Sequence, residues 1–154
     1  VSVANFLRSA KTALTGEAPK VRTWVKDVNA ALSNLQLDSS FAQRSLNEGF
    51  SGGEKKRNEI LQLLMLEPKL ALLDETDSGL DVDAVQIVSE GVAKFHNEDN
   101  SCLIITHNTR ILEKLTVDRV HVLMNGTIVE EGGAELIEEI NQRGFAHLLD
   151  GAAK

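Results

Sequence analysis

Two short apolar runs constrain the fold of this chain more than any other feature. Residues 69–75 (KLALLDE) and 101–107 (SCLIITH) each have the length of one strand, and each ends in polar side chains. The segment between them, 82–95, has apolar residues at helical spacing. Apolar runs of strand length that alternate with helices are typical of parallel strands covered on both faces. The sequence therefore predicts an α/β fold with two buried strands.

The first half of the chain has helical periodicity. Apolar residues recur three and four positions apart in 7–14 and 21–35, and the turn-forming sequence TGEAP at 15–19 separates the two stretches. The residues expected to share buried faces are Leu7, Ala10, Lys11 and Leu14, then Val21, Trp24, Val25, Val28, Ala31, Leu32 and Leu35. A loop with a short helical turn is expected over 37–50. We therefore expect an all-helical subdomain over residues 1–66.

After the second apolar run, the sequence predicts a short helix, a hairpin and a terminal helix. The short helix is expected at 109–115 and the amphipathic terminal helix at 134–149. An Asn-Gly pair at 125–126, inside the stretch 119–133, is the strongest short signal for a hairpin turn. Residues 67–154 are thus expected to form a partial α/β subdomain with a C-terminal β-hairpin.

The net charge and the cysteine content indicate which binding partners and which cellular compartment to expect. The formal net charge is -7 at pH 7, which disfavours nucleic acid as the main partner because phosphate binding needs a basic surface. Cys102 is the single cysteine, so no disulfide forms within the chain, and a reducing, cytoplasmic compartment is expected. No apolar run approaches the roughly 20 residues of a membrane helix, so no direct membrane insertion is expected.

The first motif with residues suited to binding a ligand is GFSGGEKKR at residues 49–57. Ser51 and Glu54 have the spacing of a capping box, which predicts that a helix starts here. Gly52 and Gly53 let a ligand approach the backbone closely, and the positive end of a helix attracts phosphate. An ordinary capped helix with a flexible entry is the alternative.

The second motif, LALLDETDSGLD at residues 70–81, ends an apolar run with two acids. Open α/β sheets bind ligands at the carboxyl edge of their strands. At that edge Asp74 is suited to hold Mg²⁺, and Glu75 to polarise a water that attacks a phosphate. A solvated acidic loop is the alternative. A calcium loop counted from Asp74 is excluded, because its twelfth position is Val85 instead of glutamate.

The third motif is His107, which directly follows the second apolar run. We expect it at the same sheet edge as Asp74 and Glu75, where it can bond a terminal phosphate or hold the attacking water. By itself it would be interpreted as a surface histidine in a turn. The remaining histidines receive that interpretation: His96, His121 and His147.

In this order, the three motifs resemble those of the ATP-binding-cassette (ABC) family of ATPases. FSGGE resembles the family's signature motif, LALLDE its Walker B strand, SGLD its D-loop and His107 its switch histidine. The resemblance implies ATP and Mg²⁺ as cofactors, with Asp74 on the metal and Glu75 and His107 in catalysis. It also implies a second copy of the ATPase as partner. The residues implied to contact ATP held by that second copy are Ser51, Gly52, Gly53 and Glu54, and those implied at the dimer interface are Ser78, Gly79 and Asp81.

Within the family, the sequences at 47–62 (NEGFSGGEKKRNEILQ) and 72–84 (LLDETDSGLDVDA) are similar to the SufC branch, the ATPases of SUF iron–sulfur cluster assembly. Transporter ATPases usually have Gln-Gln-Arg after the two glycines. The resemblance implies an ATPase that powers cluster assembly on SUF scaffold proteins of the SufB/SufD type. The alternatives are a nucleotide-binding subunit of a membrane ABC transporter and, for the chain alone, a non-catalytic interaction module.

A phosphate-binding P-loop, G-x-x-x-x-G-K-[ST], does not occur in these 154 residues, because no glycine is followed by lysine. We therefore expect an ABC ATPase fragment of the P-loop NTPase-like fold with an incomplete, mainly parallel sheet. In the family, the strand that leads to the P-loop lies between the His107 strand and the hairpin. Its absence is expected to favour self-association, and the chain alone is expected to be inactive.

Overall fold

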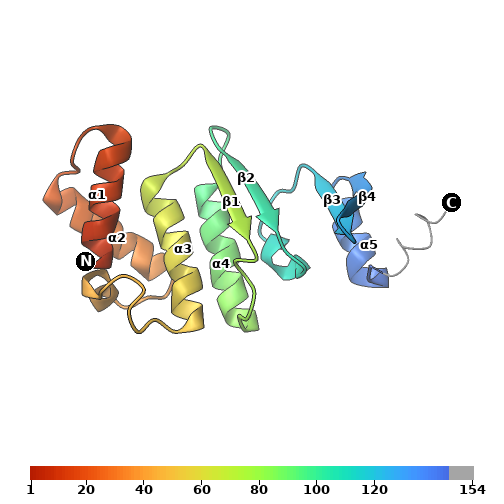
Figure 1. The fold of residues 1–154 in the computed structure, drawn as a ribbon, viewed down its shortest axis with the longest axis horizontal. Coiled ribbons are helices and arrows are strands. Elements are labelled where there is room, and N and C mark those ends of the chain that lie inside the picture. The colour runs from red at the N-terminus through yellow and green to blue at the C-terminus, as the bar shows by residue number, and fades with distance from the viewer. Residues whose placement is uncertain (146–154) are drawn as a thin grey trace. The chain divides into compact units, whose positions relative to one another are not determined.

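The computed structural model describes residues 1–145, in which helices come first and strands alternate with helices afterwards (Figure 1). The first elements are α1 (Val3–Thr15), α2 (Val21–Asn34), a 3-10 helix at Ser39–Gln43 and α3 (Gly52–Leu66). They are followed by β1 (Leu70–Asp74), α4 (Val82–Phe95), β2 (Ser101–Ile105), a 3-10 helix at Thr109–Leu112, β3 (Val120–Met124), β4 (Thr127–Gly132) and α5 (Glu135–Arg143). This order confirms the predicted α/β arrangement.

The chain forms two compact units, Val1–Ile111 and a second that begins at Leu112. In the first unit β1 and β2 form a parallel sheet, and in the second β3 and β4 form an antiparallel hairpin. The described strands thus make two small sheets instead of one continuous sheet. The subdomain boundary after residue 66 stays a prediction.

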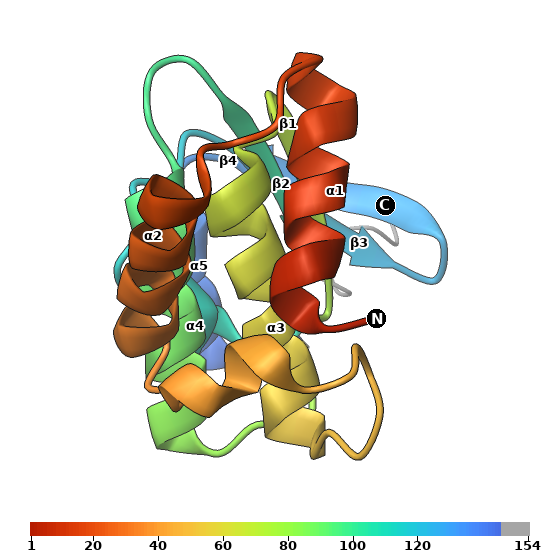
Figure 2. The same ribbon diagram turned by 90° about the vertical axis from the view of Figure 1, so that its left-hand side faces the viewer.

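The core of the first unit is built around α3. Figure 2 shows α3 between α1 and α2, and α3 also packs against α4. The contact between α3 and α4 is close at Gly91, where an added Cβ would overlap the Cγ2 atom of Ile60 and lie 3.1 Å from Leu35 Cδ2. The largest fully buried apolar side chains of this unit are Leu7, Leu32, Leu35, Ile60, Leu61 and Ile111.

The strands are less buried than predicted. Ala71 and Leu73 of β1 are buried, but Leu72 is 67% exposed, and Leu103 on the adjacent position of β2 is 53% exposed. The prediction of two strands covered on both faces is therefore wrong for the described residues. Since successive side chains of a strand point to opposite faces, only one face of this sheet packs on a core. The apolar residues on its exposed face are Leu70, Leu72, Leu103 and Ile105.

Three helical predictions also need correction. Leu14, Val21 and Val25 were expected on buried faces but are exposed. Leu14 lies in the last turn of α1 and Val21 is the first residue of α2, whereas Val25 lies at the edge of the apolar stripe of α2. The short helix predicted at 109–115 is a 3-10 helix that ends at Leu112. The terminal helix ends at Arg143, where Gly144 has a positive φ, and the predicted residues 146–149 lie outside the described part of the chain.

The second unit is a hairpin with a helix packed on it. Asn125 and Gly126 have φ values of 51° and 78°, which confirms the predicted two-residue turn, since type I′ turns need positive φ at both positions. Val122, Leu136 and Ile140 form its small core. Across residues 1–145, no helix combines the length and the apolar character needed to cross a membrane.

Candidate functional site

The candidate site lies at one end of the first unit, where β1 and β2 end and α3 and α4 begin (Figure 1). Asp74 pairs in register with Ile105, so the residues that follow both strands come out at the same edge. The start of α3 reaches this edge as well, because the Cβ position of Gly53 lies 3.8 Å from Leu80 Cδ2. The sheet edge and the helix start therefore form one surface.

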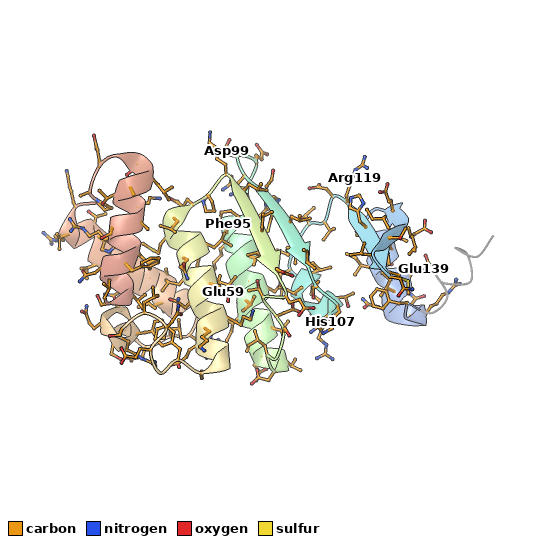
Figure 3. All side chains as sticks on the ribbon, in the orientation of Figure 1. Glu59, Phe95, Asp99, His107, Arg119 and Glu139 are labelled. Atoms are coloured by element: carbon orange, nitrogen blue, oxygen red, sulfur yellow. The ribbon has the colours of Figure 1, made fainter. Side chains whose placement is uncertain are left out.

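Glu75 and His107 meet at this edge, and Figure 3 labels His107 there. The Glu75 Oε1 atom lies 3.4 Å from His107 Nδ1, and both side chains are more than half exposed. The backbone N–H of Glu75 donates to the Ile105 carbonyl at 2.8 Å, which ties the end of β1 to β2. Glu75 has a φ of 48°, which is uncommon for a residue other than glycine and costs conformational energy. Such strain persists where the surrounding structure imposes it.

Asp74 is the last residue of β1 and its side chain is exposed beside Glu75. Among the residues that the structure describes, no three His, Cys, Asp or Glu side chains gather in a metal-binding group. Mg²⁺ in phosphate sites is commonly held by one or two carboxylates, with waters and substrate phosphates as the other ligands. A single exposed carboxylate at a strand end fits that kind of coordination.

The start of α3 has the predicted capping box. The Ser51 Oγ accepts from the Glu54 N–H at 3.2 Å, and Glu54 Oε2 accepts from the Ser51 N–H at 2.8 Å. Gly52 is exposed and has open space where a Cβ would be. The hydrogen bond from the Ser51 backbone, with that from Arg44, lowers the pKa of Glu54 below its ordinary value. This helix start can present N–H groups and a hydroxyl to an anion.

Arg44 supports the turn before α3, and the sequence analysis did not single it out. Its guanidinium pairs with Glu54 and donates to the Gly49 carbonyl at 2.9 Å. It also covers the rings of Phe41 and Phe50, with its central carbon 5.2 and 4.8 Å from their centroids. No local sequence pattern points to Arg44, because its partners come from three different segments.

The segment after Glu75 forms a turn that leads into α4. The Ser78 N–H donates to the Glu75 carbonyl at 3.0 Å, and Gly79 has a φ of 74°. Asp81 caps α4 by accepting from the Ala84 N–H at 2.8 Å. Ser78, Gly79 and Asp81 are all exposed. Asp77, which the sequence analysis also passed over, is buried inside this turn.

The arrangement suits the hydrolysis of a phosphate ester or anhydride. A carboxylate beside a histidine can polarise and orient water, and a second carboxylate can hold a divalent cation. An anion-binding helix start lies in the same surface. The three predicted motifs are therefore brought together at one end of the unit. His96 bonds Asn100 in the same unit, and His121 of the second unit bonds Glu131.

Comparisons with known proteins identify relatives of this chain. A family described as ABC transporter matches residues 3–78. Vegetative protein 296 of Bacillus subtilis is 50% identical over 147 residues, which cover 94% of this chain and 56% of that protein. A probable ABC transporter ATP-binding protein of Streptococcus pyogenes serotype M3 is 49% identical over 95% of this chain and 58% of its own length. The chain thus spans little more than half the length of these relatives.

Solved structures show a similar fold. An ATP-binding cassette of an ABC transporter in its ADP conformation superposes with a TM-score of 0.66 at 26% identity, over 97% of this chain and 63% of that chain. A dimeric cassette bound to ADP and Pi has a TM-score of 0.70 at 19% identity, over 86% of this chain and 56% of that chain. At such low identity the second likeness concerns the fold alone.

Proposed function

We propose that this chain is part of an ABC-type ATPase domain and that it supplies the Walker B, switch-histidine and signature residues of an enzyme that hydrolyses ATP with Mg²⁺. The observation that carries the proposal is the pair of Glu75 and His107, in contact at the sheet edge next to Asp74. A strained glutamate held against a histidine is expected where water is activated beside a phosphate.

Each residue has a distinct role in this proposal. Asp74 holds Mg²⁺, which neutralises charge on the phosphates when it is bound. Glu75 polarises the attacking water, and His107 orients that water or the terminal phosphate through its ring nitrogens. Because the Glu75 and His107 side chains are exposed, substrate can reach both of them without a change in the core.

The start of α3 is proposed to act on ATP held by a second copy of the ATPase. Ser51, Gly52, Gly53 and Glu54 form this surface, and the Ser51 hydroxyl and the backbone N–H groups of the two glycines are the phosphate donors. Ser78, Gly79 and Asp81 are exposed beside it and are proposed to contact the second copy. The closeness of Gly53 and Leu80 supports a shared interface, because it joins the start of α3 at residues 51–54 to the loop at 78–81.

For the cellular role, we propose an ATPase of the SUF system that works in the cytoplasm on a scaffold of the SufB/SufD type. The support is the sequence at 47–62, which is similar to that branch of the family. A second candidate is the nucleotide-binding subunit of a membrane transporter. It is favoured by the printed names of relatives such as the probable ATP-dependent transporter of Synechocystis, which is 52% identical over 79% of this chain.

The test uses the full-length protein that contains this chain. Its ATPase activity is measured with and without Mg²⁺, alone and with purified SUF scaffold proteins. We expect Mg²⁺-dependent hydrolysis that the scaffold stimulates. Hydrolysis that the scaffold leaves unchanged would refute the SUF assignment and favour the transporter candidate, and absence of hydrolysis in every condition would refute the ATPase proposal itself.

A further inference from the structure

Asp77 is a buried carboxylate whose place in the fold the proposed function does not explain. Its side chain is 3% exposed, although carboxylates are almost never buried without strong partners. The Asp77 Oδ2 atom accepts a hydrogen bond from the Thr106 hydroxyl at 2.9 Å. The other oxygen, Oδ1, has no hydrogen-bond partner within residues 1–145. A buried acceptor left without a partner destabilises the folded state, so a compensating role is expected.

The Thr106 hydroxyl extends this contact around His107. It accepts from the Asn108 N–H at 2.9 Å, so the two residues that flank His107 are bonded to each other. A hydroxyl has one proton to donate, and the Asp77 carboxylate is the nearer of its two acceptors, at 2.9 Å against 3.2 Å for the Asn108 carbonyl. The bond that Thr106 donates to Asp77 and the bond that it accepts from Asn108 therefore fix the backbone that carries His107.

The same bonds join the two loops that hold the proposed catalytic pair. Glu75 lies two residues before Asp77, and His107 directly follows Thr106. The loops are already linked by the Glu75 N–H to the Ile105 carbonyl at 2.8 Å and by the Glu75–His107 contact. The Asp77–Thr106 bond is part-buried and starts from a buried carboxylate, whereas the side chains of Glu75 and His107 are both exposed.

We propose that Asp77 is a positioning residue that acts through Thr106 to hold His107 against Glu75. The proposal rests on the proposed ATPase function and names a further residue for it. Asp77 itself touches neither substrate nor metal. Its contribution is to keep the histidine ring in place while the exposed ends of both loops contact ATP and water.

Four variants of the full-length protein test this role. Asp77→Ala removes the acceptor, and Thr106→Val removes the hydroxyl at nearly constant shape. Each is expected to lower kcat about 10-fold or more, with the KM for ATP changed by less than about 3-fold, because a small misplacement of a reacting group costs up to about 10²-fold. Asp77→Asn and Thr106→Ser keep the acceptor and the hydroxyl, so both are expected to stay within about 3-fold of the wild type.

The double variant and a control separate positioning from stability. Since Asp77→Ala and Thr106→Val break the same bond, the double variant is expected to be no slower than the slower single variant. Ser89→Ala is the matched control, because Ser89 is 1% exposed and its Oγ also has no partner in the described part of the chain. It is expected to leave kcat unchanged. Additive losses in the double variant, or wild-type kcat in Thr106→Val, would overturn the proposal.

A spectroscopic readout keeps the test independent of ATPase activity. In ¹H–¹⁵N spectra of the histidine rings, Asp77→Ala is expected to shift the His107 signals and to leave those of His96 and His121 in place. Unshifted His107 signals would refute the positioning role. If the wild type does not hydrolyse ATP, or if Glu75→Gln does not slow hydrolysis, the proposed ATPase function is refuted. The spectra of the histidine rings then still test whether Asp77 positions His107.

Discussion

Among single residues, Glu75 combines a left-handed backbone with an exposed carboxylate. Its φ of 48° places the side chain at the end of β1, beside the exposed carboxylate of Asp74, and its Oε1 atom lies 3.4 Å from His107 Nδ1. A solvated acidic loop would need neither the strained backbone nor the histidine. The geometry therefore favours the catalytic interpretation over the alternative considered from the sequence.

The first prediction concerns Glu75→Gln in the full-length protein. The amide keeps the size of the side chain but polarises water poorly, so turnover is expected to fall by a factor of about a hundred or more while ATP still binds. Steady-state hydrolysis and ATP titration measure the two effects. Glu98→Gln is the control, since Glu98 is an exposed acid in the loop between α4 and β2. Unchanged turnover in Glu75→Gln would remove Glu75 from the proposed role.

The second prediction concerns the charge on Glu54. Its pKa is lowered in the folded state, first by the Ser51 N–H and then by Arg44, so its stabilising effect is present above the unfolded pKa of about 4 and is lost as pH falls through the folded value. Glu54→Gln keeps an acceptor for the capping box but loses the ion pair. Because the pair is partly exposed, we expect a difference of no more than about 1 kcal/mol at pH 7.

The measurement for Glu54→Gln is urea unfolding of both proteins between pH 7 and pH 3. The advantage of the wild type is expected to shrink as the solution becomes acidic. A difference that stays constant across this range would show that the charge of Glu54 contributes nothing to the start of α3.

Among the elements, α3 has the most neighbours, since it packs against α1, α2 and α4. Lys11 of α1 donates to the Leu66 carbonyl and pairs with Glu67, and Arg57 of α3 donates to the Gln36 carbonyl at 3.2 Å. These bonds tie the end of α3 to α1 and its middle to the end of α2. The orientation of residues 51–54 at the start of α3 is thus set by the packing of the whole helix.

The third prediction tests the contact between α3 and α4. Gly91→Ala places a methyl group onto Ile60 Cγ2, so the two helices must separate, and we expect a loss of about 1–3 kcal/mol of unfolding free energy. Gly52→Ala is the matched control, because nothing lies within 4 Å of its Cβ position. Denaturant unfolding of both variants is the measurement. Equal stability of the two would contradict the close packing at Gly91.

At the level of the whole molecule, the proposed ATP site lacks one component within these 154 residues. The acidic sheet edge and the start of α3 are present, but the sequence contains no G-x-x-x-x-G-K-[ST]. The P-loop normally supplies most contacts to the phosphates. The surface described at the sheet edge is therefore expected to bind nucleotide weakly by itself.

The fourth prediction is that these 154 residues alone show no measurable ATPase activity and bind ATP no more tightly than about 1 mM, or about 4 kcal/mol. Titration calorimetry of the chain, with the full-length protein as positive control, measures the affinity. A micromolar dissociation constant would show that the remaining residues form a complete nucleotide site.

The fifth prediction is that the chain alone self-associates. The exposed face of the β1–β2 sheet includes Leu72 and Leu103, and exposed apolar sheets with an unpaired edge strand favour association. Sedimentation over a range of concentrations is expected to show species larger than a monomer, and Leu72→Lys to reduce them. Val25→Lys changes an apolar residue that is also more than half exposed, but on α2, and is expected to have little effect. A monomer at every concentration would contradict the prediction.

The order of the elements and the start of α3 follow from the sequence by itself, because they depend on neighbouring residues. The capping box of Ser51 and Glu54 acts over one helical turn, and the Asn125–Gly126 turn needs only the backbone freedom of two residues. The meeting of Glu75 and His107 was also predictable. Parallel strands share a carboxyl edge, so residues just after both strands have to lie there.

Tertiary structure alone decided which faces are covered and which distant polar groups meet. Leu72 and Leu103 have the same apolar character as the buried Leu73, and they are exposed because no layer of the first unit covers their side of the sheet. The bond between Asp77 and Thr106 joins residues 29 positions apart. Hydrophobic periodicity describes one segment at a time, whereas burial and such contacts depend on how segments pack together in space.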